Sequence, residues 1–414
     1  MPNFSRIILR RNKADAVKRF HPWIFSGAIK QVDPDLPDGE IVDVHSETGE
    51  YLATGIYSPN NIAVKVLSFE PVADLDRLFQ ARFQSAYQVR SQLGLTDSET
   101  TNCYRLINAE GDGLPGLIVD WYNGTAVLQA YSIGMYEQRQ RIVASLQAVY
   151  GEKLQAVYDK SAAVLPRSAI QAIHAAGHHQ DSRQDSDQDS HQDNHYLVGE
   201  PATGNVLEYG NQFQVDWETG QKTGLFLDQR EHRRLLGQYA AGKRVLNTFC
   251  YSGGFSVYAL QAGASLVHSV DSSAKAIDWT KQNVALNYPE ATQHEAFTDD
   301  IFDFLKTCDA DYDLIVLDPP AFAKNISARH QAVMAYKRLN KQALTKLRSG
   351  GFLFTFSCSQ VVGREHFEGA VMAAAIESGR QIRVLHHLTQ PADHPVSIFH
   401  PEGIYLKGLV LWVE

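Results

Sequence analysis

The sequence contains no apolar run long enough to cross a membrane and no apolar segment near its start. A membrane-spanning helix needs about 18 consecutive apolar residues, and no stretch of this chain approaches that length. Residues 1–6 lack the apolar core of a secretory signal peptide. We therefore expect a cytoplasmic protein that does not interact with membranes.

Cysteine is scarce, and its spacing argues against two common uses of this residue. The four cysteines, Cys103, Cys250, Cys308 and Cys358, are far apart and form no Cys-x-x-Cys pair. We therefore expect neither a disulfide framework nor a metal site. The apolar (44%) and charged (21%) fractions are those of globular proteins, which excludes wholesale disorder.

Positive charge is also in deficit, which argues at first against a nucleic-acid partner. The net charge is -9 at pH 7, whereas nucleic-acid-binding proteins usually carry a basic surface. However, residues 177–195 hold five Asp and one Arg, which contribute -4 to that total. Residues 1–30 hold seven Lys or Arg against one Asp, which gives +6. This basic cluster can bind a nucleic acid, although a solvated face explains it equally well.

The expected elements divide the chain into three domains. Residues 1–72 contain short strands separated by turns, which indicates a small β-barrel. Residues 73–215 begin with a linker helix and continue as an α+β middle domain with a helix at 136–150. The polar residues 177–195 interrupt this domain; their histidines suggest metal binding, but the composition favours a disordered loop. Residues 216–414 alternate between strands and helices, with helices expected at 274–287 and 301–307 among others. This alternation predicts an α/β doubly wound sheet closed by an antiparallel hairpin of strands at 382–388 and 404–413.

In this last domain the turn after the first expected strand, residues 244–249, contains two adjacent glycines. Gly253 and Gly254 allow a tight turn and a close approach of the backbone to a ligand. The motif Gly-x-Gly-x-x-Gly is absent, which argues against a dinucleotide-dependent dehydrogenase.

Acidic residues follow the next strands of this sheet. Asp271 ends the second strand, where a carboxylate can accept hydrogen bonds from ribose hydroxyls. Asp299 and Asp300 stand at the next strand–helix junction, where a carboxylate can accept from an adenine amino group. Each acid alone is more often a helix N-cap. Their joint placement indicates an adenosine ligand without phosphate, such as S-adenosylmethionine (SAM).

An acid and a cysteine follow two further strands. Asp318 precedes two prolines, and Cys358 follows the strand expected at 351–357. A buried cysteine is usually only a small apolar side chain. The ends of neighbouring strands lie side by side, however, so these two side chains can share a pocket. A thiolate that attacks carbon 6 of cytosine makes carbon 5 nucleophilic, and a carboxyl group near nitrogen 3 stabilises that adduct.

The motifs resemble those of the RNA cytosine-5 methyltransferases of the ribosomal large-subunit methyltransferase I type. The resemblance covers nearly the whole chain and rests on residues 224–230, 247–255, 318–322, 356–359 and 392–408. It implies a PUA RNA-binding barrel, a middle domain and a Rossmann-like class I methyltransferase domain with a seven-stranded sheet. It also implies methylation of one cytosine in 23S ribosomal RNA, either free or in an assembling large subunit.

The resemblance also assigns roles to single residues. Cys358 matches the nucleophile, and Asp318 is the expected acid beside the base. The residues expected to bind SAM are Phe226, Asp228, Gln229, Arg230, Asn247, Phe249, Tyr251, Gly253, Gly254, Asp271, Asp299, Asp300 and Asp318, with Asp300 the better match on the adenine side. The residues expected to bind RNA are Arg11, Lys13, Lys18, Arg19, Trp23 and Phe322.

Two other functions remain open at this stage. An N-methyltransferase that acts on guanine or adenine often carries an aromatic residue directly after Asp-Pro-Pro, but here Ala321 intervenes before Phe322. A non-catalytic RNA-binding assembly factor would not need the acids at the expected SAM positions. The sequence leaves the oligomeric state open, including a homodimer.

Overall fold

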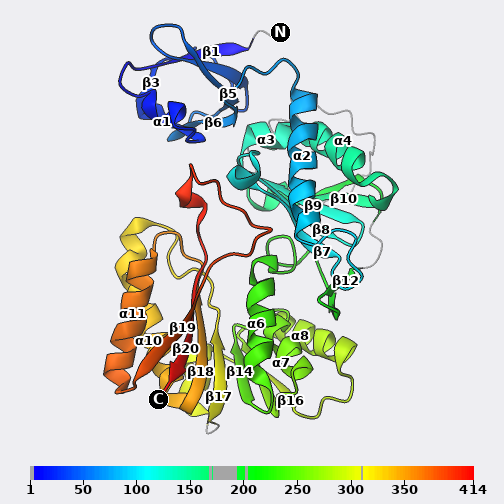
Figure 1. Cartoon of the computed structure of the whole chain (residues 1–414), viewed down its shortest axis with the longest axis vertical. Helices are drawn as coiled ribbons and strands as arrows, with labels where there is room; N and C mark the ends of the chain where they lie inside the picture. The colour runs from blue at the N-terminus through cyan, green and yellow to red at the C-terminus, as the bar shows by residue number, and fades with distance from the viewer. Residues whose placement is uncertain (1–3, 167–169, 171–193, 201–203, 309–310) are drawn as a thin grey trace. The chain divides into compact units, whose positions relative to one another are not determined.

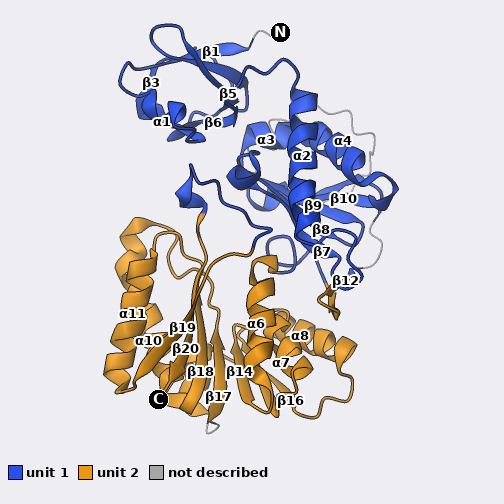
Figure 2. Cartoon of the chain, viewed as in Figure 1, with its two compact units in different colours: residues 1–206, 215–225, 392–403 blue, residues 207–214, 226–391, 404–414 orange. Residues whose placement is uncertain are grey.

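The structure is a computed structural model that describes residues 4–166, 170, 194–200, 204–308 and 311–414. Its contacts group the chain into two compact units (Figure 2). Unit 1 comprises residues 1–206, 215–225 and 392–403, and unit 2 comprises residues 207–214, 226–391 and 404–414. The predicted domain boundaries at residues 72 and 215 stay a prediction.

Unit 1 begins with a six-stranded sheet in the order β2-β6-β5-β4-β1-β3 (Figure 1). The strands are β1 (Ser5–Leu9), β2 (Trp23–Phe25), β3 (Ile29–Gln31), β4 (Ile41–His45), β5 (Tyr51–Tyr57) and β6 (Ile62–Ser68). The two edge strands, β2 and β3, are joined only by the 3-10 helix η1 (Ser26–Ala28). Because so short a link connects the two edges, the sheet must curl toward closure. A core that includes Ile7, Val42 and Val64 fills its interior.

The second part of unit 1 is a five-stranded sheet in the order β11-β10-β9-β8-β7. Its strands are β7 (Cys103–Asn108), β8 (Leu117–Tyr122), β9 (Thr125–Ala130), β10 (Ala156–Asp159) and β11 (His195–Val198). The helices are α2 (Leu75–Gln92), α3 (Ile133–Glu137) and α4 (Arg139–Tyr150), and α2 packs against α4. Asp74 caps α2 by accepting hydrogen bonds from the backbone N–H groups of Asp76 and Arg77.

Unit 2 is built on a seven-stranded sheet in the order β16-β15-β14-β17-β18-β20-β19. The strands are β14 (Arg244–Thr248), β15 (Leu266–Asp271), β16 (His294–Thr298), β17 (Tyr312–Leu317), β18 (Leu347–Ser357), β19 (Ile382–Leu388) and β20 (Lys407–Val413). The helices are α6 (Arg230–Ala240), α7 (Gly254–Gln261), α8 (Ala274–Asn287), α9 (Ile301–Thr307), α10 (Arg329–Lys346) and α11 (Arg364–Ser378). A separate hairpin, β12 (Asn205–Glu208) and β13 (Asn211–Gln214), precedes them.

The direction of winding reverses beside β14. The chain runs from β14 through β15 to β16, then returns to the other side of β14 at β17, and these neighbours are parallel. Ligands of doubly wound sheets bind at such a reversal, beyond the carboxyl ends of the strands. The last strand, β20, is antiparallel to both β18 and β19, which confirms the predicted closing hairpin.

Some elements differ from the predicted ones. The helix expected at 136–150 is divided into α3 and α4 at Gln138. Residues 177–193 of the predicted polar loop lie outside the described residues, and His195 does not belong to that loop because it begins β11. The sequence also did not predict β2, β3, β10, β11, β16 and α6.

Within the described ranges, no helix is long and apolar enough to cross a membrane. The same residues bring together no group of three or more His, Cys, Asp or Glu side chains that could hold a metal ion.

Candidate active site

The turn between β14 and α7 has an uncommon backbone. Phe249 (φ 53°), Tyr251 (φ 49°) and Gly253 (φ 77°) all adopt the left-handed region, which costs free energy for the two aromatic residues. Neighbouring side chains hold this conformation, because Thr280 Oγ1 donates to the Tyr251 carbonyl and Asn283 Nδ2 donates to the Ser252 carbonyl. Backbone strain that the surroundings maintain is typical of functional sites.

Both glycines of this turn face protein atoms. A Cβ on Gly253 would lie 2.7 Å from Cγ2 of Thr280, and a Cβ on Gly254 would lie 2.7 Å from Cδ of Arg233. The structure shows a close approach of the turn to α8 and α6, whereas the predicted approach of this pair to a ligand stays a prediction. This packing fixes the position of the turn at the end of β14.

Asp271 joins this turn to the next strand end. Its Oδ2 accepts a 3.1 Å hydrogen bond from the backbone N–H of Tyr251, and its Oδ1 accepts a 2.9 Å bond from that of Ser273. A carboxylate has about four acceptor positions, so Asp271 keeps capacity for ribose hydroxyls. Asn247 offers a further acceptor, because its Oδ1 is buried and has no partner among the described residues. These acceptors fit the adenosine end of SAM.

The two acids after β16 have different surroundings. Asp300 is the N-cap of α9, since its Oδ1 accepts from the backbone N–H groups of Phe302 and Asp303. The backbone N–H of Asp299 donates to the Asp271 carbonyl, and both acidic side chains are exposed. The structure thus brings Asp299 beside Asp271, while Asp300 uses one carboxylate oxygen to stabilise its helix. Which of the two acids faces adenine stays a prediction.

The segment predicted to cover the cofactor leads into α6. The ring of Phe226 packs edge-on against Tyr251, with centroids 4.9 Å apart, and Tyr251 packs in turn against Trp279. Asp228 is buried, and its Oδ2 accepts a 2.7 Å hydrogen bond from the hydroxyl of Tyr405. Arg230 is also buried, and its Nε lies 3.3 Å from Glu231 Oε1.

Asp318, the acid after β17, is oriented by a chain of polar side chains. Gln229 Nε2 donates a 2.9 Å hydrogen bond to Asp318 Oδ1, and Gln229 Oε1 lies 2.5 Å from Nδ1 of His232. Burial lowers the pKa of His232 to about 4, so its imidazole is neutral at pH 7. Because the Gln229 amide nitrogen faces the Asp318 carboxyl group, the Gln229 amide oxygen faces Nδ1 of His232, and His232 also hydrogen-bonds to the backbone at Thr389.

Cys358 and Asp318 lie at the ends of two paired parallel strands, β18 and β17. The Sγ of Cys358 lies 3.9 Å from the carbonyl oxygen of Pro319, the residue that follows Asp318. The structure therefore brings together the two residues predicted to carry the chemistry. Phe322 continues the same loop, and its half-buried ring packs against Tyr336 at 4.7 Å between centroids.

The sequence did not single out Lys407 as part of this site. Lys407 is the first residue of β20 and pairs in register with Ser357, the neighbour of Cys358. Its Nζ donates a 2.6 Å hydrogen bond to the Ser359 carbonyl. Burial lowers the pKa of Lys407 to about 8, and attraction to Cys358 opposes that decrease. A mostly protonated ammonium group close to the thiol favours the thiolate.

Comparisons with known proteins agree with this architecture. A family model described as an S-adenosylmethionine-dependent methyltransferase matches residues 126–397, and a PUA-like domain model matches residues 7–69. A ribosomal RNA large subunit methyltransferase I from Escherichia coli (strain SMS-3-5 / SECEC) is 38% identical over 411 residues, which cover 97% of this chain and 98% of that protein. This chain belongs to the ribosomal RNA large subunit methyltransferase I family. The cofactor of this family member is S-adenosylmethionine.

Other comparisons support the same family and its fold. The ribosomal RNA large subunit methyltransferase I of Shigella flexneri is 38% identical, with 97% of this chain and 98% of that protein covered. A solved structure of a proposed SAM-dependent methyltransferase from Streptococcus mutans has a TM-score of 0.80 at 24% identity, and the match covers 99% of this chain and 100% of that one. At this identity the match supports the fold alone. It agrees with the predicted α/β class of the methyltransferase I family.

The residues predicted to bind RNA in the PUA-like part differ in their exposure. Arg11, Lys13 and Arg19 are exposed, and Lys18 is paired with Glu50 at 2.6 Å. Trp23 is half-buried and packs against His400 with centroids 4.2 Å apart, and its Nε1 donates a 2.8 Å hydrogen bond to Glu110. Its contacts within unit 1 therefore use much of the ring that was predicted to meet RNA.

Proposed function

We propose that this protein transfers a methyl group from SAM to carbon 5 of a cytosine in 23S ribosomal RNA. The observation that carries the proposal is the position of the Cys358 thiol beside the loop that Asp318 begins, at the ends of two adjacent parallel strands. A methyltransferase that acts on an exocyclic or ring nitrogen has no use for a thiol at this place. Carbon 5 of cytosine, by contrast, reacts only after a nucleophile adds to carbon 6.

Cys358 begins the reaction as a thiolate that forms a bond to carbon 6 of the cytosine. Electron density moves from the broken 5,6 double bond to carbon 5, which can then take up a methyl group. Bound SAM supplies that group as an electrophilic methyl on a sulfonium. Water takes the proton from carbon 5, and the electrons of that bond re-form the 5,6 double bond as the Cys358 thiolate leaves carbon 6. Nitrogen 3 returns its proton to Asp318.

Asp318 acts on the same ring from the neighbouring strand end. A carboxyl group that donates a proton or hydrogen bond to nitrogen 3 stabilises the charge that develops when the thiolate adds. The hydrogen bond from Gln229 fixes the orientation of this carboxyl group. Asp318 is thus the positioned acid, and Gln229 is a positioning residue.

Recognition of the RNA is assigned to the PUA-like residues 7–69 and to the methyltransferase loops. Arg11, Lys13 and Arg19 provide exposed positive charge that can contact phosphates. Phosphate contacts orient an RNA without reading its sequence, so the choice of one cytosine requires further contacts with bases.

The proposal is tested with Cys358→Ala and the matched control Cys308→Ala. Cys308 is the other cysteine that is not fully buried, and it lies between α9 and the start of β17, away from the strand end that precedes Asp318. The 23S ribosomal RNA from cells that lack this protein and express each variant is analysed by bisulfite sequencing. We expect one cytosine to be protected with the wild-type protein and with Cys308→Ala, and to be unprotected with Cys358→Ala.

Two results would reject this proposal. A methylated guanine or adenine in place of a methylated cytosine would favour the N-methyltransferase. Full protection by Cys358→Ala would exclude the covalent role of this thiol. In the purified variant, calorimetry should show SAM binding close to that of the wild-type protein, because the thiol is not part of the predicted SAM site.

A further inference from the structure

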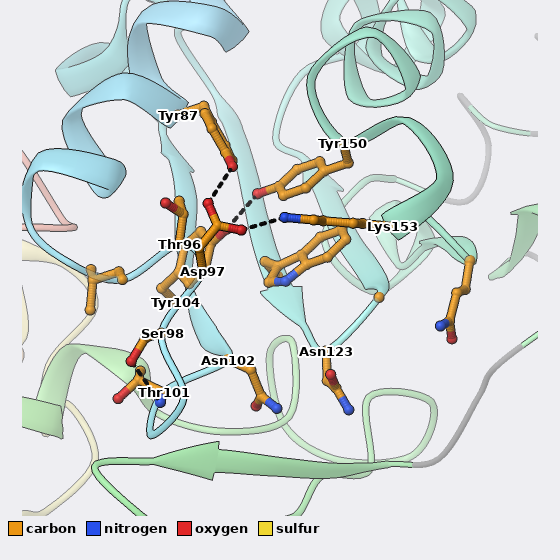
Figure 3. Close-up of a pocket in the computed structure, with 14 residues that line it drawn as sticks. Tyr87, Thr96, Asp97, Ser98, Thr101, Asn102, Tyr104, Asn123, Tyr150 and Lys153 are labelled. Carbon is orange, nitrogen blue, oxygen red and sulfur yellow. Dashed lines mark hydrogen bonds and ion pairs between the residues drawn. The ribbon is translucent and has the colours of Figure 1, made fainter.

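The middle part of unit 1 contains a pocket of about 280 Å³ that the proposed chemistry does not use. It lies where the ends of β7, β8 and β10 meet the carboxyl-terminal ends of α2 and α4 (Figure 3). Its aromatic lining residues are Tyr87, Tyr104, Trp121 and Tyr150, and its polar ones include Thr96, Ser98, Asn123 and Gln155.

The aromatic side chains form one ordered cluster. Trp121 and Tyr150 stack in parallel, with centroids 3.8 Å apart and an angle of 2° between the rings. Tyr87 meets Tyr150 edge-on at 5.4 Å. The hydroxyl groups of Tyr104 and Tyr150 lie 2.9 Å apart. These rings are fixed before any ligand arrives, which reduces the entropy cost of binding.

Two hydrogen-bond donors of this cluster have no acceptor among the described residues. The first is the indole Nε1–H of Trp121, a side chain that is only 6% exposed. The second belongs to the tyrosine pair, because a single hydrogen bond between the hydroxyls of Tyr104 and Tyr150 uses only one of their two protons. Burial raises the pKa of both tyrosines, so both hydroxyl protons are retained near neutral pH. A ligand that brings acceptors can therefore bind to these donors.

The rim adds groups that can both donate and accept. The exposed amide of Gln155 borders the pocket beside Gly124 and makes no hydrogen bond with another described side chain. The two charged residues that line the pocket neutralise each other, because Lys153 is paired with Asp97 (Figure 3). Aromatic walls, free donors, an amide and little net charge suit a neutral, flat group with acceptors along its edge. A nucleobase has this chemistry, and single-stranded RNA presents such bases to proteins.

We propose that this pocket binds one unpaired base of the ribosomal RNA substrate, at a place separate from the methylated cytosine. The inference rests on the proposed function, because it takes RNA to be the substrate. Trp121 and the tyrosine pair donate hydrogen bonds to the acceptors of the base, and the Gln155 amide forms hydrogen bonds with its remaining polar atoms. The pocket then supplies base contacts that phosphate-binding residues cannot provide.

The test uses the variant Trp121→Phe/Gln155→Ala, with Gln147→Ala as the matched control. Phenylalanine keeps an aromatic ring against Tyr150 but removes the N–H group, while Gln147 is an exposed residue of α4 outside the pocket. Binding to an in-vitro transcript of 23S ribosomal RNA is measured at several salt concentrations. We expect the double variant to bind about five- to thirtyfold more weakly, because two hydrogen bonds are lost. The salt dependence should stay the same, because no phosphate contact is lost.

Wild-type RNA affinity in the double variant overturns the inference. If the double variant melts far below the wild-type protein, the single variant Gln155→Ala replaces it in the test, because this side chain is exposed and its loss should leave the fold intact. Wild-type RNA affinity in Gln155→Ala would then overturn the inference. The proposed function is judged separately by the cytosine protected by the wild-type protein. If the wild-type protein methylates its cytosine and the variants bind RNA normally, the pocket does not bind the RNA, while the proposed methyltransferase reaction still holds.

Discussion

The Nζ of Lys407 donates a 2.6 Å hydrogen bond to the carbonyl oxygen of Ser359, the residue that follows Cys358. This bond holds a buried ammonium group beside the proposed nucleophile, although the two residues are 49 positions apart in the sequence. The antiparallel pairing of β20 with β18 produces this proximity. A positive charge close to a thiol lowers the pKa of that thiol.

We predict that Lys407→Met weakens methylation most strongly at low pH. Loss of the ammonium group raises the pKa of the Cys358 thiol, so the rise of kcat/KM with pH shifts to higher pH by about one unit. At pH 7 this shift corresponds to a loss of about tenfold. In the wild-type protein, kcat/KM should fall again above about pH 8, where Lys407 itself loses its proton. The measurement is the pH profile of methyl transfer to ribosomal RNA.

Lys346→Met is the matched control for this prediction. Nζ of Lys346 also donates to a backbone carbonyl at a cysteine, that of Cys308, but it lies away from the proposed site. Its pH profile should match that of the wild-type protein. An unchanged profile in Lys407→Met would show that the ammonium group does not assist the thiol.

The hydrogen bond from Gln229 to Asp318 predicts a loss of turnover in Gln229→Leu. This variant keeps the approximate size of the side chain but removes the hydrogen bond that Gln229 donates to the Asp318 carboxyl group. The Asp318 carboxyl group becomes charged when it gives its proton to nitrogen 3. Since a hydrogen bond to a charged group is worth about 1.5–3 kcal/mol, we expect kcat to fall by about ten- to a hundredfold. The KM for RNA should change little. Gln238→Leu, on the exposed face of α6, which begins directly after Gln229, is the control and should keep wild-type kcat.

Gly253 and Gly263 separate the effect of crowding from that of backbone conformation. Both have a positive φ, but a Cβ on Gly253 would lie 2.7 Å from Thr280, whereas a Cβ on Gly263 would meet nothing within 4 Å. We expect Gly263→Ala to lower the free energy of unfolding by about 1 kcal/mol, and Gly253→Ala by a further 1–3 kcal/mol. Only Gly253→Ala should also weaken SAM binding in calorimetry. Equal losses of stability would show that the turn adapts to the added methyl group.

The sequence predicted those elements whose hydrophobic pattern is strong. The helices at Ala274–Asn287 and Ile301–Thr307 and the strand at Ile382–Leu388 have the predicted bounds. It did not predict α6, whose residues Arg230–Ala240 are mostly polar because they pair with neighbours such as Glu208. The strand β16 (His294–Thr298) lies at the edge of the sheet, where burial imposes little apolar pattern.

The residues of the proposed site also differ in whether the sequence could locate them. Residues that directly follow strands, such as Asp271, Asp318 and Cys358, could be located because parallel strands end at one edge of a sheet. Lys407 reaches Ser359 across 48 positions, and His232 reaches Asp318 only through Gln229, whose hydrogen bond to Asp318 spans 89 positions. Single-sequence patterns contain no signal for such contacts. The role of Gly253 and Gly254 as packing positions likewise depends on Thr280 and Arg233, which only the fold brings near.

Buried His232 predicts that part of the stability is lost in mild acid. Its pKa is about 4 in the folded protein but about 6.5 in an unfolded chain, so below pH 6.5 the unfolded chain takes up a proton that the folded protein does not. Folding stability therefore falls as the pH decreases from 6.5 to 4, by up to about 3 kcal/mol from this residue. His232→Gln keeps a hydrogen-bonding side chain without a titrating group and should lose this dependence.

The measurement is urea unfolding of the wild-type protein and of His232→Gln between pH 4 and pH 7. The two stability curves should converge as the pH falls, because only the wild-type protein loses free energy of unfolding through a buried imidazole that resists protonation. His330→Gln is the control: this side chain is exposed, so its variant should follow the wild-type curve. Parallel curves for the wild-type protein and His232→Gln would show that His232 is protonated without cost, which would contradict a neutral imidazole at this buried position.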